Sequence, residues 1–489
     1  MTMTTDNRPK RLDAREMMAL YRAFSREESG MVTVFALFMI FCMSLMAGIG
    51  LDMMRHETNR AQIQQVSDRA VLAAADLDQT LDPEAVVRDY FAKSGMSDFV
   101  SNVNVDEGIN YRTVTVEAET NMNTMFMDFL GRETLRVPAL STATERIEKV
   151  EISMVLDISG SMGWNNKMPN LRNAANVFLD TVLTEDNRGL ISVSLAPYTA
   201  QTNAGPHIFD LLNVDQTHDW SYCVDFEDTD FDTTAIYFGS PLNPTPYEHM
   251  QHFDAGWGWP GWHNGEDTIT NPGCPKQEFE TVYAFSQDKQ ALKDRINQFQ
   301  ARANTAIHLG MKWGVALLDP EWRKFNAVLP TAAGVDPAFR NRPDDFRDPS
   351  NPTSMETVKT IILMTDGENV HTQRIADRYY AQYSHWLHWS KYPLNGYLNR
   401  YVYSNDHWRW RYTKYTPTQA DGLLDRICDA AKDKGIIIWT IAFEAPPRGE
   451  EVMRDCASSQ AHYFSVDGTE ITDAFESIAR SINKLRLTQ

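Results

Sequence analysis

Three short segments of the sequence place carboxylates and hydroxyls where they could share a metal ion. Asp157, Ser159 and Ser161 follow an apolar run in the pattern D-x-S-x-S, and Asp366 directly follows a second apolar run. Thr305 stands in a third segment, just ahead of a helical stretch. Carboxylate and hydroxyl oxygens suit Mg²⁺ or Mn²⁺, and Mg²⁺ usually keeps several waters. These five residues therefore predict a divalent-cation site with room for an outside ligand.

The same residues also have a purely structural explanation, because Asp and Ser are common in turns and at helix N-termini. The metal site is favoured by the order of the three segments and by the place of each at the end of an expected element. No general base, cysteine nucleophile or basic phosphate clamp is evident beside them, so we expect a binding site and not an enzyme. A metal-dependent hydrolase that uses Asp157 or a histidine of the insertions is the less favoured alternative.

Apolar strand-like runs alternate with amphipathic helices from Val150 onward, and this alternation positions the candidate residues. The expected strands are residues 152–156, 190–195, 360–364, 436–443 and 463–466. The pattern predicts an α/β fold with a doubly wound, mostly parallel sheet, covered by helices on both faces. Ligand sites in such folds lie beyond the carboxyl ends of the strands, where Asp157 and Asp366 fall.

The remaining chain divides by composition. We expect a cytoplasmic segment at 1–30, a transmembrane helix at 31–51, a membrane-proximal helix at 52–81 and a small α/β unit at 82–147. The α/β domain then spans 148–489 and carries insertions at about 199–285 and 373–420, which are too long for ordinary connections. Both insertions are rich in aromatic residues. We expect these rings to form satellite cores, and a sugar-binding or partner-binding surface is the alternative.

The run from Met31 to Leu51 contains no charged residue. A helix of that length rises about 30 Å, enough to cross a bilayer. A long polar segment precedes the run, which favours an anchor over a cleaved signal peptide. Basic residues are more frequent before the run than after it, so the positive-inside rule places the N-terminus in the cytoplasm and the rest outside.

The expected membrane-proximal helix carries a narrow apolar seam. Its residues recur in steps of three and four: Ile63, Val66, Ala70, Ala73 and Leu77. Such a seam packs either on a partner's helix or on the protein's own next unit, and the second is the more common case. Within that unit, the alternation of residues 111–119 predicts a half-buried strand.

Charge and cysteine usage narrow the class of protein. The formal net charge of -20 argues against binding to nucleic acid. Cys42 lies in the apolar run, and the other four cysteines can pair in three ways, or remain as buried thiols. We favour pairing of Cys223 with Cys274 and of Cys428 with Cys456, because each pair is close in sequence and outside the cytoplasm.

Two further groups of residues are weaker metal candidates. The acidic run 225–232 lacks the glycine that a calcium-binding EF-hand loop needs, so we expect a solvated loop. The histidines at 385, 388 and 407 fit no standard metal spacing.

The five candidate residues resemble the metal-ion-dependent adhesion site (MIDAS) of von Willebrand factor A domains. Asp157, Ser159 and Ser161 match its D-x-S-x-S loop, Thr305 matches a threonine five residues before a helical glycine, and Asp366 matches its T-D-G strand end. The resemblance implies that the serines, and in some cases the threonine, touch the metal directly and that the aspartates often act through water. It further implies a protein partner that offers a carboxylate to complete the metal's shell.

One position departs from that family. The loop before Thr305 reads Arg302-Ala303-Asn304, where the family usually has a pair of glycines.

A second resemblance covers nearly the whole chain. Several passages resemble TadG-like proteins of the bacterial tight-adherence (Flp) pilus machinery: residues 28–30, 48–52, 65–75, 428–432, 456–459 and 475–479. The resemblance implies a single-pass protein of the inner membrane, with a periplasmic or surface-facing C-terminal domain that serves pilus assembly or adhesion. A scaffold whose metal site recruits no partner is the main alternative. We expect no prepilin-type cleavage at Gly30, because Phe35 stands where that processing needs Glu.

Overall fold

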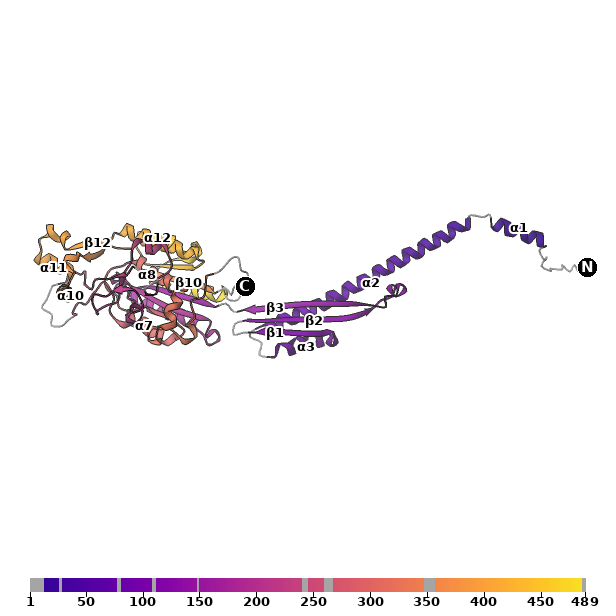
Figure 1. The fold of residues 1–489 in the computed structure, drawn as a ribbon, viewed down its shortest axis with the longest axis horizontal. Coiled ribbons are helices and arrows are strands. Elements are labelled where there is room, and N and C mark those ends of the chain that lie inside the picture. Colours follow the sequence, from indigo (N-terminus) through magenta and orange to yellow (C-terminus); the bar gives the residue numbers. More distant parts are fainter. Residues whose placement is uncertain are drawn as a thin grey trace, which may run out of the picture. The chain divides into compact units, whose positions relative to one another are not determined.

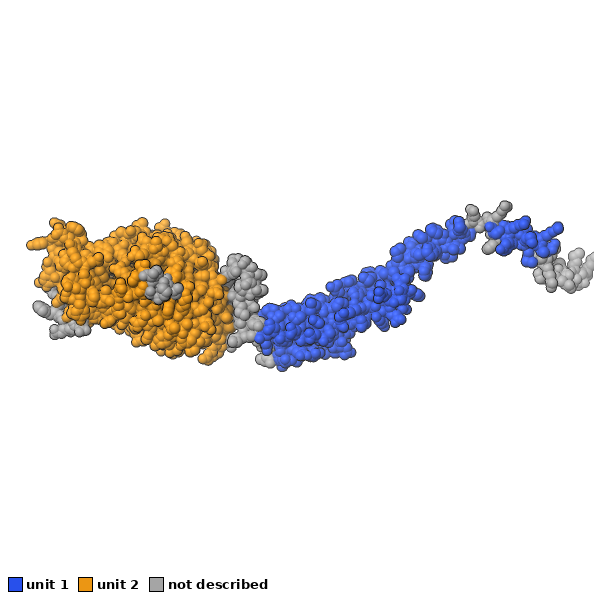
Figure 2. Space-filling view, viewed as in Figure 1, with its two compact units in different colours: residues 1–146 blue, residues 147–489 orange. Residues whose placement is uncertain are grey.

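The computed structural model describes residues 13–25, 29–76, 81–107, 111–146, 149–239, 245–258, 267–346 and 357–485. The chain divides into two compact units, residues 1–146 and 147–489 (Figure 2).

The N-terminal unit combines helices with one antiparallel sheet. Its helices are α1 (Ala14–Phe24), α2 (Ser29–Ala75) and α3 (Pro83–Lys93), with short 3-10 helices η1 (Ser97–Phe99) and η2 (Met127–Leu130). Its strands are β1 (Val100–Glu107), β2 (Tyr111–Asn123) and β3 (Thr134–Arg146), in the order β1-β2-β3. Asp82 caps α3 by accepting a hydrogen bond from the backbone N–H of Ala85 at 2.9 Å.

Helix α2 runs without interruption through the expected transmembrane segment and on through the expected membrane-proximal helix as far as Ala75. By length and composition it is apolar and long enough to cross a membrane, and it alone is so among the described helices. Its C-terminal half packs on the sheet of its own unit. Ile63 and Ala70 are buried there with Phe91 of α3 and with Val114 and Val116 of β2. The seam is thus used within the chain; its last residue lies outside the described residues.

The C-terminal unit is built on a six-stranded mixed sheet. Its order is β14-β13-β10-β4-β5-β9. The bounds are β4 (Val150–Asp157), β5 (Ile191–Tyr198), β9 (Tyr283–Ser286), β10 (Val358–Thr365), β13 (Ile437–Phe443) and β14 (Tyr463–Val466). Five strands are parallel, and the edge strand β9 runs antiparallel to β5. The mixed α/β class and the apolar N-terminal helix are confirmed; the antiparallel β9 was not foreseen.

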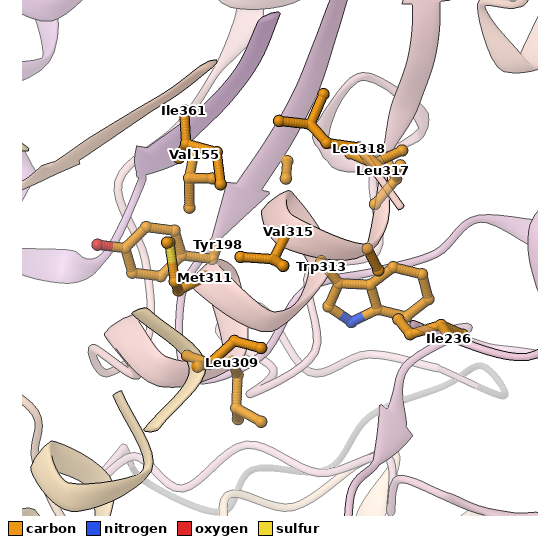
Figure 3. Packing of buried hydrophobic residues seen from close by; sticks show 14 of the residues in the cluster. Val155, Tyr198, Ile236, Leu309, Met311, Trp313, Val315, Leu317, Leu318 and Ile361 are labelled. Carbon is orange, nitrogen blue, oxygen red and sulfur yellow. The ribbon is translucent and has the colours of Figure 1, made fainter. Parts of the chain in front are cut away.

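Helices cover both faces of this sheet. One face carries α4 (Lys167–Val182), α7 (Lys289–Gln298) and α14 (Glu470–Leu485), and the other carries α8 (Ile307–Ala316), α12 (Pro417–Asp433) and α13 (Pro447–Cys456). Neighbouring residues of a strand therefore enter different cores: Leu156 belongs to the core that contains Phe178 of α4, while Val155 belongs to the core that contains Trp313 of α8. Figure 3 shows part of this second core. This alternation explains why β4 and β5 are buried along their whole length.

Helix α8 lies unusually close to the sheet because of two glycines. A Cβ atom at Gly310 would lie 2.5 Å from the Tyr198 ring, and one at Gly314 would lie 2.1 Å from Val155. Only glycine permits this approach, which brings the N-terminal end of α8 to the carboxyl ends of the strands.

Short elements fill the connections of this unit. The helices are α5 (Pro206–Phe209), α9 (Arg323–Val328), α10 (Tyr383–Trp389) and α11 (Leu394–Tyr401). The strands are β6 (Val214–Asp215), β7 (Val224–Asp225), β8 (Tyr247–His249), β11 (Thr372–Ile375) and β12 (Arg411–Tyr415). β6, β8 and β7 form one small sheet, and β11 pairs with β12. Figure 1 shows β12 at the same end of the unit as α10 and α11.

The two insertions share one satellite core. Cys223, Phe253 and Cys274 of the first insertion pack with Trp389 and Leu398 of the second. The expectation that the aromatic residues form satellite cores therefore holds for rings such as Trp389. Trp257 and Trp408, in contrast, are exposed. Trp259 and Trp262 lie outside the described residues.

Both favoured disulfides are present. Cys223 bonds Cys274 and Cys428 bonds Cys456, while Cys42 is free. The first closes a loop with a sequence separation of 51, which corresponds to about 4 kcal/mol in the loop-entropy model. The second joins α12 to α13 inside the main core, whereas the first lies in the satellite core.

Candidate metal site

The loop after β4 is held by the last residue of that strand. Asp157 is fully buried, and its Oδ1 accepts a hydrogen bond from the backbone N–H of Ser159 at 2.7 Å. Its Oδ2 accepts from the Thr365 hydroxyl at the end of β10, at 2.6 Å. One carboxylate thus ties together the ends of two adjacent parallel strands.

The structure brings all five predicted residues to the same edge of the sheet. The Thr305 hydroxyl donates to Ser159 Oγ at 2.8 Å, and the Ser159 and Ser161 hydroxyls lie 3.1 Å apart. The Ser161 hydroxyl donates to Asp366 Oδ1 at 2.6 Å. Three hydroxyls and two carboxylates from three distant segments therefore form one connected cluster.

The loop before Thr305 packs directly on the D-x-S-x-S loop. The backbone N–H of Gly160 donates to the carbonyl of Ala303 at 3.0 Å, and a Cβ atom at Gly160 would lie 2.9 Å from that carbonyl. Ala303 has a φ of 57°, a left-handed conformation that favours glycine. Its N–H donates to Asn271 Oδ1 at 2.7 Å. The loop therefore adopts a glycine-like conformation although it lacks the family's glycine pair.

A buried ion pair anchors the same loop to the end of the first insertion. Arg302 lies 3.0 Å from Glu280, whose side chain is fully buried. Burial raises the pKa of the Glu280 carboxyl to about 7, although the charge of Arg302 opposes this shift. The insertion thereby helps to position Thr305.

Lys167 is a functional candidate that the sequence analysis missed. It opens α4, only 7% of it is exposed, and its ammonium donates to Asp366 Oδ2 at 3.0 Å. Glu444 Oε2 lies 3.8 Å from the same ammonium. The only local sequence signal for a role of Lys167 is its position six residues after Ser161, at the start of a helix. Its partner Asp366 lies far along the chain, so the pairing itself leaves no local pattern.

The loop that follows Asp366 is also held at the site. The backbone N–H of Val370 donates to the Thr305 carbonyl at 3.2 Å. The Asn369 side chain accepts a hydrogen bond from the N–H of Ile307 at 2.8 Å, at the start of α8. The segments that carry Asp366 and Thr305 are thereby fixed to one another.

The electrostatics of the cluster fit a small divalent cation. Asp157 and Asp366 are both buried, yet Lys167 supplies the only ammonium that faces them within the described part of the chain. Burial, and then the charge of Asp366, raise the pKa of Asp157 to about 7. Hydroxyls and carboxylates are hard oxygen donors, and an excess of negative charge in a buried place is relieved by a bound cation.

The other candidates named from the sequence do not form metal sites. Among the described residues, no group of three or more His, Cys, Asp and Glu side chains could hold a metal ion. His407 bonds the carbonyl of Leu398, and His388 packs against the Tyr397 ring. The expected solvated loop at 225–232 is wrong for Asp225, which is buried in an ion pair with Arg374.

Comparison with known proteins identifies one part of the chain. Residues 30–77 match the family model described as "Tad: Putative Flp pilus-assembly TadE/G-like". No curated protein matches the chain by sequence.

Several solved structures resemble the chain at low identity. The von Willebrand factor domain of the type V pili tip protein Mfa5 from Porphyromonas gingivalis is 15% identical, with a TM-score of 0.34, over 70% of this chain and 97% of that one. The pilus adhesin SpaC from Lactobacillus rhamnosus GG is 12% identical, with a TM-score of 0.32, over 79% of this chain and 34% of that one. The PilB minor pilin from Streptococcus sanguinis is 12% identical, with a TM-score of 0.31, over 80% of each chain. This chain thus spans about a third of the SpaC chain, and scores of this size establish neither a shared fold nor a shared function.

Proposed function

We propose that the chain is a membrane-anchored envelope protein of the tight-adherence (Flp) pilus machinery that binds a protein partner through a divalent cation. The match of residues 30–77 to a TadE/G-like pilus-assembly family supports the pilus-related part. One observation carries the binding part: three hydroxyls and two carboxylates converge at the carboxyl ends of β4 and β10.

The C-terminal unit in this proposal is a von Willebrand A domain. Five parallel strands with helices on both faces support it, as does the place of the candidate site beyond the carboxyl ends of adjacent strands. The N-terminal anchor is α2, which would hold the chain in a bacterial inner membrane with the N-terminus in the cytoplasm. The C-terminal unit would then be periplasmic or surface-facing, where its two disulfides are stable.

Each candidate residue has a distinct role in this site. Ser159, Ser161 and Thr305 would hold Mg²⁺ or Mn²⁺ directly through their hydroxyls, and Asp157 and Asp366 would orient the waters around it. The bound cation supplies the positive charge that attracts a carboxylate of the partner. Asp157 also keeps the ends of β4 and β10 together, so the hydroxyls are positioned before any ligand arrives. No residue here is assigned a catalytic role.

Titration calorimetry with Mg²⁺ and with Mn²⁺ tests the metal site on the full chain in lipid nanodiscs. We expect saturable binding by the wild type and none by the Asp157→Asn, Asp366→Asn double variant. Asp180→Asn is the matched control, because Asp180 is a partly exposed carboxylate paired with Lys293 away from the site, and it should bind like the wild type.

The opposite outcome has a defined meaning. If the folded wild type binds neither ion, the metal site is refuted, and with it both the metal-dependent binding and the scaffold with a loaded site. The ammonium of Lys167, which neutralises part of the charge of Asp366, would then explain how the cluster folds without a cation.

A further inference from the structure

The connection between β2 and β3 exposes a group of large apolar side chains. We call residues 124–131 the β2–β3 tip. Met125, Phe129 and Leu130 are 65%, 80% and 56% exposed. Isolated apolar residues on a surface are ordinary, but a contiguous exposed group marks a surface that is covered by something else.

The β2–β3 tip is locked onto one level of α2. The carboxylate of Asp52, fully buried, accepts hydrogen bonds from the backbone N–H groups of Met125 at 3.0 Å, Phe126 at 2.7 Å and Met127 at 2.9 Å. One turn earlier in α2, a Cβ atom at Gly48 would lie 2.3 Å from the Phe126 ring. A buried carboxylate and a missing side chain thus fix the tip beside residues 48–52 of α2.

That level coincides with the end of the apolar stretch of α2. The charge-free run ends at Leu51, and Gly48 lies three residues before that end. At 1.5 Å per residue, the Phe126 ring packs about 5 Å inside the apolar stretch. Figure 1 shows the β2–β3 connection lying against the middle of α2. The exposed side chains of the tip therefore stand where the hydrocarbon of a bilayer meets its headgroups.

We propose that the β2–β3 tip inserts into the membrane interface beside α2, so that lipid covers Met125, Phe129 and Leu130. This inference rests on the proposed membrane anchor, and the tip continues the lipid-facing surface of that anchor. Apolar side chains at such a level sink about 5–10 Å into the boundary of headgroups and acyl chains. Asp128, the one acidic residue of the tip, limits the depth to the interface.

The consequence is a second point of membrane attachment. A single helix leaves a domain free to tilt and to move along the membrane normal. With the tip inserted and tied to Asp52, the N-terminal unit keeps one height above the bilayer. Since α2 is continuous from the apolar stretch into the core at Ile63, that height is transmitted to the sheet.

Spin-label accessibility tests the insertion on the full chain in liposomes of phosphatidylethanolamine and phosphatidylglycerol. In a Cys42→Ala background the remaining four cysteines are paired, so Phe129→Cys supplies one labelling position. Ile40→Cys, exposed on α2, is the lipid reference, and Leu140→Cys, exposed on β3, is the water reference. We expect the label at 129 to collide with oxygen as at 40, and to show a several-fold loss of collisions with a water-soluble nickel complex relative to 140.

Asp52→Ala in the same background tests whether the lock sets the level. Without the carboxylate, three backbone N–H groups lose their acceptor, and the label at 129 should gain access to the nickel complex while the label at 40 does not change. Such a result changes the accessibility of the label at 129 alone, whereas general unfolding of the unit would change the accessibility of labels elsewhere in it as well.

Three outcomes would overturn parts of the proposal. A label at 129 that is as accessible to nickel as the label at 140, with 40 in lipid, refutes the insertion and leaves the anchor standing. Low collision with both reagents at 129 shows that protein, not lipid, covers the tip. A label at 40 that is open to nickel refutes the anchor itself.

Discussion

Among the places where the C-terminal unit buries carboxylates, two balance charge in opposite ways. In the first, which we call the closed centre, Asp225 faces two cations. Arg374 donates to its two oxygens at 2.8 and 2.5 Å, and Lys414 lies 3.4 Å away. Burial alone would raise the pKa of Asp225, but the two cations outweigh it and lower the pKa to about 2.

The second, which we call the open centre, is the candidate metal site. Here two buried carboxylates, Asp157 and Asp366, share the single ammonium of Lys167. The pKa of Asp157 is raised to about 7, the opposite of the shift at Asp225. The closed centre is complete within the chain and ties β7 of one insertion to β11 of the other. The open centre lacks positive charge, which is the property that a cation-binding site needs.

Loss of the cation at the closed centre should have the largest effect. Arg374→Met leaves Asp225 buried with only Lys414, and breaking such a pair costs about 3–5 kcal/mol. Urea unfolding followed by tryptophan fluorescence measures this, because all 12 tryptophans lie at or after Trp164. Arg409→Met is the control: Arg409 is an exposed partner of Asp406, and its loss should cost less than about 1 kcal/mol. If Arg374→Met and Arg409→Met lowered the free energy of unfolding equally, the buried pair at the closed centre would contribute no more than an exposed pair.

Removal of a carboxylate at the open centre should behave differently. In EDTA, the free energy of unfolding of Asp366→Asn should lie within about 1 kcal/mol of that of the wild type. Relief of the repulsion with Asp157 offsets the loss of the pair with Lys167, whose ammonium keeps Glu444 at 3.8 Å. Mg²⁺ at one hundred times its Kd should stabilise the wild type by about 2.7 kcal/mol and the variant not at all. The same urea titration, run with EDTA and with Mg²⁺, gives both numbers. A large loss of stability in EDTA would mean that Asp366 is a structural residue.

Lys167 should weaken cation binding, because its ammonium repels a metal near Asp366. Lys167→Met should raise the affinity for Mg²⁺ about tenfold. Two positive charges at this distance repel by a few kcal/mol, and solvent screening reduces the repulsion to about the free energy of a tenfold change in affinity. Glu444→Gln removes a negative charge near the same ammonium and should lower the affinity. Titration calorimetry on both variants checks whether the affinity for Mg²⁺ rises in Lys167→Met and falls in Glu444→Gln. Unchanged or weaker binding in Lys167→Met would show that the lysine orients Asp366 and does not oppose the cation.

The two centres should also respond to pH in opposite directions. The pKa of Asp157 in the folded protein is about 7, above its unfolded value of 3.8, so its contribution to stability is complete below about pH 4 and is lost as the pH rises through 7. The contribution of Asp225 is present above pH 3.8 and is lost as the pH falls toward 2. In EDTA, Asp157→Asn should therefore gain on the wild type by about 2–3 kcal/mol between pH 5 and pH 8. Urea midpoints at both values test it, and a gap that does not vary with pH would contradict the raised pKa.

The open centre was predictable from the sequence to the extent that its residues follow clear elements. β4 and β10 each contain a largely apolar run, at 152–156 and 360–364, so Asp157 and Asp366 could be placed at the strand ends from spacing alone. Lys167 could not be found in this way, since only the folded chain brings it to Asp366. That a metal binds there stays a prediction.

The insertions were the least predictable part. The four residues of β9 (Tyr283–Ser286) form too short an apolar run to stand out inside an insertion, and their antiparallel pairing with β5 depends on the path of that insertion. The partner of Asp225 is Arg374 of the other insertion, and nothing in the acidic run indicates a buried ion pair. Contacts between two irregular segments leave no periodic pattern for a sequence to display.

The smallest effect should come from the backbone that shapes the open centre. Ala303 has a φ of 57°, which costs an alanine more than a glycine, so Ala303→Gly should stabilise the C-terminal unit by about 0.5–1 kcal/mol. Ala301→Gly is the matched control in the same loop, and it should destabilise because glycine adds entropy to the unfolded chain there without relieving strain. If the strained alanine instead presets the loop that holds Thr305, Ala303→Gly would weaken Mg²⁺ binding while raising the urea midpoint. Measuring the midpoint and the Mg²⁺ affinity of both variants separates a backbone that is merely tolerated from one that helps to build the site.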